Sequence, residues 1–169
     1  MLLNFSKMKR IFLCFIWIPV FAACQKSDTL TSPTNDPPAA NVDMLQMINK
    51  VRAEGCKCGT EQMPPVPAVT WNSKLEAAAK QHSDYMHTTG NFSHTQSNGS
   101  TVGTRVKSAG YNWRFVAENI AAGQTTTTQV MDSWLKSPNH CKNIMSAGAK
   151  EMGAARSGNY WTQVFAGPL

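Results

Sequence analysis

The stretch W-L-K-S-P-N-H-C at residues 134–141 constrains the fold most, because an apolar helical repeat meets a proline there. The apolar positions that recur at helical spacing are Val130, Met131, Trp134 and Leu135. Pro138 disfavours helical geometry at the residue before it, so the helix is predicted to end at Ser137. His140 then follows on a turn. It either caps the helix, where positive charge is favoured, or belongs to a site built on that rigid base.

An export signal precedes the domain. Basic residues around Arg10 are followed by eleven apolar residues, 11–21, and then by small residues that end at Cys24. This order is typical of a secretory signal peptide, and the apolar run is shorter than the roughly 20 residues of a spanning helix. F-A-A-C at 21–24 is similar to a bacterial lipobox. We expect residues 1–23 to be removed and Cys24 to carry the lipid that anchors the protein in a membrane; secretion without a lipid is the alternative.

Composition separates a tether from a folded domain. Residues 24–40 are rich in Ser, Thr, Pro and Asn, which is typical of a flexible tether. The apolar fraction of 42 % indicates a globular protein, and we expect one folded domain over residues 41–169. Without the signal peptide, 13 basic and 10 acidic residues give a net charge of +3, which is too weak to favour a nucleic-acid partner. We expect a monomer.

Three cysteines remain in the predicted domain, at Cys56, Cys58 and Cys141. In an exported protein two of them are expected to form a disulfide. A bridge between Cys56 and Cys58 across one residue is geometrically unfavourable, so Cys141 is expected to pair with one of the two, and the sequence leaves open which. A zinc site made of the three cysteines and His140 is the alternative, with suitable ligand types but poor C-x-C spacing.

Hydrophobic periodicity predicts helices followed by a late hairpin. Helices are expected from Asn41 or Asp43 to residue 54, from a capping box at Ser73 and Glu76 to residue 89, over 104–109 and over 126–137. Residues 55–69 are expected to form a loop. Strands are expected at 115–121, 150–155 and 160–165, the last two joined by a Gly-Asn turn. This arrangement predicts an α+β sandwich with an antiparallel sheet.

Four titratable side chains are candidates for a site. His82 shares the apolar face of its helix, so we interpret it as a hydrogen-bonded core residue. Glu118 lies between apolar neighbours of a predicted strand, and if buried it needs a positive partner or a metal. His94 and His140 each follow a helix end. Two imidazoles and a carboxylate suit either a divalent cation such as zinc or a general acid–base site.

Seven motifs follow one another in order through the predicted domain. They are I-N-x-x-R (48–52), W-N-x-x-L-x-x-A-A (71–79), H-S-D-Y-M (82–86), F-S-H (92–94), A-E-N-I-A (117–121), W-L-x-S-P-x-H (134–140) and Y-W-T-Q-V-F (160–165). In this series the chain closely resembles the bacterial branch of the CAP superfamily, which includes cysteine-rich secretory proteins, venom allergens and plant pathogenesis-related proteins. The resemblance implies a three-layer α-β-α sandwich with a central antiparallel sheet and a cleft that holds histidines and acidic residues.

The resemblance also implies roles for particular residues. His94, Glu118 and His140 match cleft positions of the family, as possible metal ligands or catalytic groups. This chain departs at two positions from the pattern of the eukaryotic family members: Ser137 stands where they have a glutamate, and Tyr160 stands where they have a second histidine. Tyr160 is therefore a candidate ligand-cleft residue.

The function implied is that of a noncatalytic binding module in the cell envelope, with a divalent cation, a lipid, a peptide or a protein as its ligand. The alternative is an envelope hydrolase that uses His94, Glu118 and His140. The sequence contains neither G-x-S-x-G nor H-E-x-x-H, which favours the binding module. A structural protein with a vestigial cleft is the third hypothesis.

Overall fold

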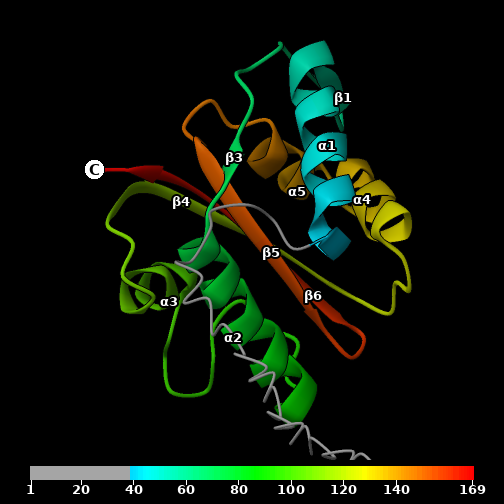
Figure 1. Cartoon of the computed structure of the whole chain (residues 1–169). Coiled ribbons are helices and arrows are strands. Elements are labelled where there is room, and N and C mark those ends of the chain that lie inside the picture. The colour runs from blue at the N-terminus through cyan, green and yellow to red at the C-terminus, as the bar shows by residue number, and fades with distance from the viewer. Residues whose placement is uncertain (1–38) are drawn as a thin grey trace, which may run out of the picture. The chain divides into compact units, whose positions relative to one another are not determined.

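A four-stranded sheet forms the middle layer of the computed structural model, which describes residues 39–169 (Figure 1). Its strands are β3 (Thr70–Trp71), β4 (Trp113–Ala122), β5 (Glu151–Ser157) and β6 (Tyr160–Pro168). Their order is β3-β5-β6-β4, in which β6 pairs antiparallel with both β4 and β5, and the short β3 pairs parallel with β5. The predicted late hairpin is confirmed as β5–β6, and β4 is an edge strand.

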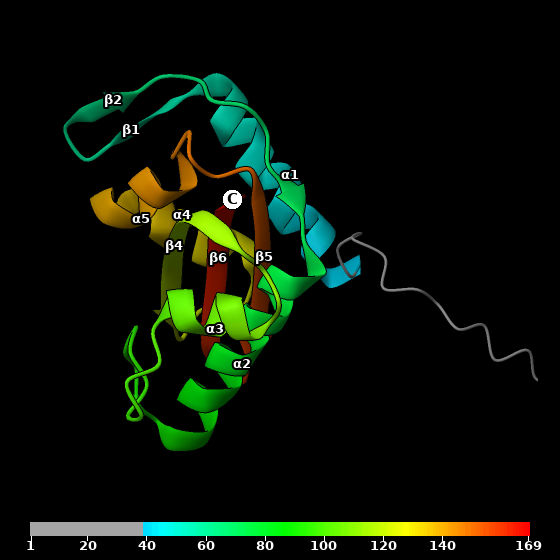
Figure 2. The same cartoon turned by 90° about the vertical axis from the view of Figure 1, so that its left-hand side faces the viewer.

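Helices cover both faces of this sheet, which gives the three predicted layers (Figures 1 and 2). The helices are α1 (Ala39–Glu54), α2 (Ser73–Thr89), α3 (Val102–Ser108), α4 (Thr127–Lys136) and α5 (Pro138–Ile144). Helices α2 and α3 pack with Val164 and Ala166 of β6, whereas α1, α4 and α5 pack around Trp134 with Phe165. Alternate residues of β6 therefore enter two separate cores, so this strand is buried on both faces.

The helix that contains Trp134 ends where the proline predicts, but a second helix begins at once. Ser137 has the extended backbone angles φ −90° and ψ 118°, which ends α4. Pro138 is then the first residue of α5, a position where proline's missing N–H leaves no hydrogen bond unmade. The expectation that His140 lies on a turn is therefore wrong, because His140 belongs to the first turn of α5.

Three other helix starts differ from the prediction by one to four residues. Helix α1 begins at Ala39, ahead of the expected caps. The cap of α2 is Asn72 instead of Ser73, because the Asn72 side chain accepts hydrogen bonds from the N–H groups of Lys74 and Leu75. Helix α3 begins at Val102, since Thr101 caps it by accepting from the N–H of residue 104. Helix ends are set by such local hydrogen bonds, which periodicity does not detect.

The segment predicted as a loop contains a hairpin. Strands β1 (Cys56–Cys58) and β2 (Glu61–Met63) pair antiparallel around a two-residue turn, in which Gly59 has φ +65°. Strands of three residues are too short to show a clear alternation, and the flanking prolines favoured the loop interpretation. The hairpin lies against α5 through a buried cysteine pair.

Residues 1–38 lie outside the described part of the chain. The predicted signal peptide, the lipid on Cys24 and nearly all of the tether fall there and stay predictions. Among residues 39–169, no helix has both the length and the apolar character needed to cross a lipid bilayer.

Candidate functional site

Glu118 is the central residue of the candidate site. It pairs with Val164 across β4 and β6, so its side chain is on the face that α2 and α3 cover. The carboxylate is only 2 % exposed, and each of its oxygens has a partner: Oε1 lies 2.9 Å from Nδ1 of His94, and Oε2 lies 2.6 Å from Nη2 of Arg105. Glu118 thus has the positive partner that a buried carboxylate requires.

Arg105 is a site residue that no pattern in the sequence reveals. It lies on α3, its side chain is 1 % exposed, and it also donates hydrogen bonds to the backbone carbonyls of Ser100 and His94. It therefore fixes both the glutamate and the loop that presents His94. The available signal was indirect: a buried glutamate demands a cation, but nothing in the sequence separates Arg105 from a surface arginine.

The partners of His94 determine which ring nitrogen is available. A carboxylate only accepts hydrogen bonds, so the proton of a neutral His94 lies on Nδ1, toward Glu118. Nε2 then keeps its lone pair, on a side chain that is 56 % exposed. A fixed imidazole with a free Nε2 is what a metal ligand or a general base requires.

His82 is a hydrogen-bonded core residue, as predicted. Its Nε2 lies 2.9 Å from the carbonyl oxygen of Ser93, and its Nδ1 accepts from the side-chain amide of Gln96 at 3.4 Å. Burial lowers the pKa of His82, although the nearby charge of Glu118 opposes that shift. A neutral His82 therefore holds the loop that follows α2 and carries His94.

His140 approaches the site from the other face of β4. The side-chain amide of Asn119, next to Glu118 on β4, donates to the carbonyl oxygen of His140 at 3.2 Å. Asn143 of α5 donates in turn to the carbonyl of Glu118 at 3.2 Å and to Oδ1 of Asn119 at 2.8 Å. These bonds dock α5 on the edge strand. Burial lowers the pKa of His140, and the neighbouring charge of His94 lowers it further.

Tyr160 is placed apart from the carboxylate. It begins β6 opposite Ala122, four residues along from the Glu118 pair, which is about 13 Å at the rise of a strand. Its ring packs with Phe92 at a centroid distance of 6.2 Å, and Phe92 is 50 % exposed. The structure thus joins His94 to Glu118 by a hydrogen bond and brings His140 within electrostatic range of His94. Tyr160 contacts Phe92, which lies on the same loop as His94.

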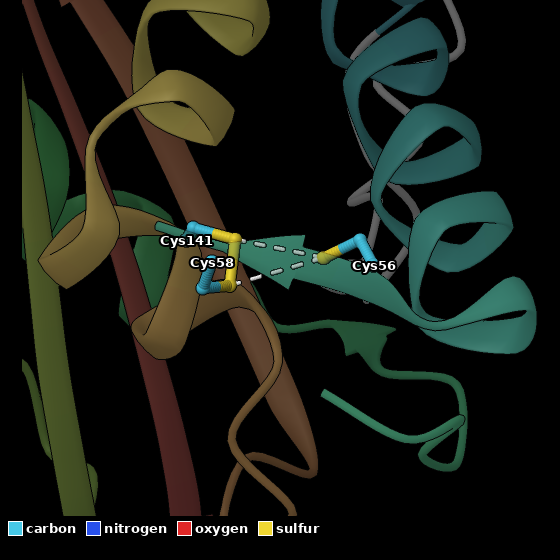
Figure 3. A group of neighbouring side chains, drawn as sticks. All are labelled: Cys56, Cys58 and Cys141. Atoms are coloured by element: carbon cyan, nitrogen blue, oxygen red, sulfur yellow. Dashed lines mark hydrogen bonds between the residues drawn. A yellow bond between two sulfur atoms is a disulfide. The ribbon is translucent and has the colours of Figure 1, made fainter. Parts of the chain in front are cut away.

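The cysteines form a separate cluster. The disulfide joins Cys58 to Cys141, which settles the choice that the sequence left open (Figure 3). Cys56 is free, and its sulfur lies 3.5 Å from that of Cys141 and 3.8 Å from that of Cys58. Burial raises the pKa of the Cys56 thiol.

Among residues 39–169, these three cysteines are the one group of three or more His, Cys, Asp or Glu side chains whose ligand atoms all lie within 4.8 Å of one another. His140, the fourth ligand of the alternative zinc site, is not part of this group. Metal binding by the cysteines would require reduction of the disulfide, because thiolates are the ligands.

A cavity of about 690 Å³ lies between α3 and the start of β4, lined by Thr101, Lys107 and Trp113 among others. None of the predicted site residues lines it. The chemistry of the candidate site is therefore that of the exposed His94 beside a buried ion pair, and this cavity does not contribute to it.

Comparison with known proteins identifies the fold and the family. The curated protein YkwD of Bacillus subtilis is 27 % identical over an alignment of 148 residues, and the match covers 86 % of this chain and 54 % of the relative. This chain thus spans about half the length of that relative. An extracellular protein with an SCP domain from Bacillus anthracis has a TM-score of 0.66 at 23 % identity, over 74 % of this chain and 39 % of that one.

Two further structures share the fold at lower identity. An outer surface protein from Borrelia burgdorferi has a TM-score of 0.65 at 17 % identity, over 75 % of this chain and 91 % of that one. NaASP2, solved with Zn²⁺, has a TM-score of 0.54 at 14 % identity, over 79 % and 82 % of the two chains. The model of the cysteine-rich secretory protein family matches residues 45–165, and the chain therefore belongs to this family, the CAP superfamily.

Proposed function

We propose that this protein is an exported, lipid-anchored CAP domain that acts as a noncatalytic binding module. The predicted signal peptide and the lipobox-like sequence that ends at Cys24 support anchoring in the cell envelope. The extracellular protein of Bacillus anthracis and the outer surface protein of Borrelia burgdorferi, which share the fold, are consistent with that location. The recognition site in this proposal is the surface of His94, with His140 within electrostatic range of it.

The observation that carries the proposal is the chain of contacts from Arg105 through Glu118 to His94. Both carboxylate oxygens are occupied, so Glu118 is arranged to orient His94 instead of binding a ligand directly. In metal sites, a carboxylate that accepts from one ring nitrogen fixes the other nitrogen for coordination. In this proposal, His94 Nε2 and His140 are the protein ligands of a divalent cation such as zinc, and Glu118 is the supporting carboxylate. NaASP2, which shares the fold, was solved with Zn²⁺, and this supports the choice of zinc as the probe.

The exposed Phe92 ring, packed against Tyr160, adds an apolar contact two residues from His94. An organic ligand would contact the Phe92 ring together with the imidazole of His94. A lipid or a peptide of the envelope has the required mixture of apolar and polar groups.

Zinc titration calorimetry tests the proposal. In a background of Cys14→Ser, Cys24→Ser and Cys56→Ser, which removes the cysteines outside the disulfide, we expect stoichiometric binding by the oxidised protein. The affinity should fall to an undetectable level in His94→Ala and His140→Ala, and by about 10- to 100-fold in Glu118→Gln, which leaves the ligand atoms but loosens His94. His87→Ala is the matched control, since His87 is exposed on α2 outside the site. Equal binding by all four variants, or none by the parent protein, contradicts the cation site.

The His94–Glu118 pair also favours one alternative, an envelope hydrolase. A carboxylate that orients an imidazole is the arrangement of a general base, and His94 Nε2 would activate a water molecule. Peptide-bond cleavage that is lost in both His94→Ala and Glu118→Gln would establish this activity, whereas cleavage that persists unchanged in them would identify a contaminant.

A further inference from the structure

Cys56 is a free thiol beside a disulfide, and this is the feature of the chain that the binding site leaves unexplained. Its sulfur lies 3.5 Å from Cys141 and 3.8 Å from Cys58, so it contacts both halves of the bond (Figure 3). A thiol that is left over in an exported domain is unusual, because oxidising compartments favour pairing. Because its sulfur contacts an existing disulfide, Cys56 can take part in thiol–disulfide exchange, which an isolated cysteine cannot do.

The geometry of the hairpin permits Cys56 to replace Cys58. Cys56 and Cys58 are two residues apart on β1, and residues at that spacing point to the same face of a strand. A slide of β1 by two residues would therefore bring the Cys56 side chain to the place of Cys58 without turning the strand over. The β1–β2 sheet has only two strands with three register pairs, so few backbone hydrogen bonds oppose the slide.

We propose that the disulfide Cys58–Cys141 exchanges with a second disulfide, Cys56–Cys141. The thiolate of Cys56 attacks the sulfur of Cys141, the new bond forms as the old one breaks, and Cys58 leaves as a thiolate. Cys58 then takes up the proton that Cys56 released. One disulfide and one thiol exist before and after the step, so no external oxidant or reductant is consumed.

Cys141 is the sulfur that both bridges share, because a bond between Cys56 and Cys58 across one residue is disfavoured. Exchange changes which thiol is free: Cys56 is free in the pairing that the structure shows, where Cys58 is 1 % exposed and Cys56 is partly exposed, and Cys58 is free in the other. It also changes how α5 is held, since Cys141 follows His140 directly on that helix. The two pairings therefore attach the helix of the candidate site to different positions of the hairpin.

Peptide mapping of the full chain distinguishes the two bridges, because Lys57 separates the two cysteines. Trypsin yields residues 53–57 with Cys56, residues 58–74 with Cys58 and residues 137–142 with Cys141. The chain would carry Cys14→Ser and Cys24→Ser, be incubated with a small monothiol as exchange catalyst, and have its free thiols blocked with N-ethylmaleimide in acid. We expect a major link between 58–74 and 137–142 and a minor link between 53–57 and 137–142.

Two single variants complete the test. In Cys58→Ser we expect nearly every molecule to carry the link between 53–57 and 137–142, and in Cys56→Ser only the link between 58–74 and 137–142. The proposal is overturned if folded Cys58→Ser, checked by circular dichroism, contains two blocked thiols after oxidation. If Cys58→Ser does not fold, the parent chain decides the matter: absence of the minor link after incubation with the monothiol also overturns the proposal.

Discussion

At the scale of single residues, the site depends on one buried carboxylate. Glu118 orients His94 with one oxygen and is balanced by Arg105 with the other. A buried charge is costly unless paired, so Arg105 is as necessary to the site as the histidine itself. His82 lies close to the same carboxylate, at 3.8 Å from Oε1, and stays neutral because burial disfavours its charged form.

Lowered histidine pKa values predict a loss of stability in acid. His82 has a pKa below the value of about 6.5 expected in the unfolded chain, so below that pH the unfolded state binds more protons than the folded state. The contribution of a neutral His82 to the free energy of unfolding should therefore be fully present above about pH 7. It should decline as the pH falls through about 6.5. The shift of His140 acts in the same direction.

Urea denaturation between about pH 7.5 and about pH 5 measures this effect, with a limit of about 1.4 kcal/mol per pH unit for each histidine. His82→Gln keeps a donor for the carbonyl of Ser93 but does not titrate. We expect the free energy of unfolding to depend less steeply on pH in this variant than in the parent protein. The same pH dependence in both proteins would show that His82 does not contribute to the loss of stability in acid.

At the scale of elements, the packing of α2 on the sheet requires a glycine. A Cβ atom on Gly153 of β5 would lie 2.1 Å from the backbone nitrogen of Glu76 and 2.4 Å from the backbone carbon of Leu75. Ala78 and Ala79 on α2 are buried in the same layer. Small side chains on both elements thus let the helix and the strand approach closely, and this contact positions the loop that follows α2, where His94 lies.

Gly153→Ala should therefore destabilise the fold by about 3 kcal/mol, the upper part of the range for overpacked cores. Thermal or urea unfolding measures the difference. Gly123→Ala is the matched control: its Cβ would meet no atom within 4 Å, and only its φ of +96° opposes the substitution, so we expect a loss of about 1 kcal/mol. Equal losses in the two variants would contradict the close contact between α2 and β5.

Helix α5 is a short element that its neighbours hold at several points. Arg52 of α1 is fully buried and donates to the carbonyls of Ile144 and Ser146, at and just beyond the end of α5. Asn119 and Asn143 tie the helix to β4, and Cys141 ties it to β1. A helix of seven residues is unstable in isolation, so these contacts determine where His140 lies.

At the scale of the whole molecule, the disulfide joins parts of the chain that are 83 residues apart. On the chain-entropy model, a loop of that length stabilises the folded state by roughly 4.5 kcal/mol. We expect reduction of the parent protein to lower the free energy of unfolding by about this amount, measured by urea denaturation with and without a reductant. Cys141→Ser should show no dependence on the reductant. Equal stability of the reduced and oxidised parent would mean that the bridge is dispensable.

The sequence by itself determined the long helices and strands and the residue types of the site. Apolar periodicity, Pro138 and the Gly-Asn turn act over a few residues, and they predicted the long helices, strand β4 and the late hairpin. The alternation around Glu118 also raised the question of burial, and a buried carboxylate needs a positive partner or a metal.

Only the tertiary structure decided which side chains meet. Arg105 reaches Glu118 because α3 packs on the edge strand, Cys58 bonds Cys141 because β1 lies against α5, and Gly153 is required because α2 crosses β5. The physical reason is that local patterns specify an element through its own backbone and apolar face, whereas partners distant in sequence are fixed by how the layers pack. That packing appears in no single stretch of the chain.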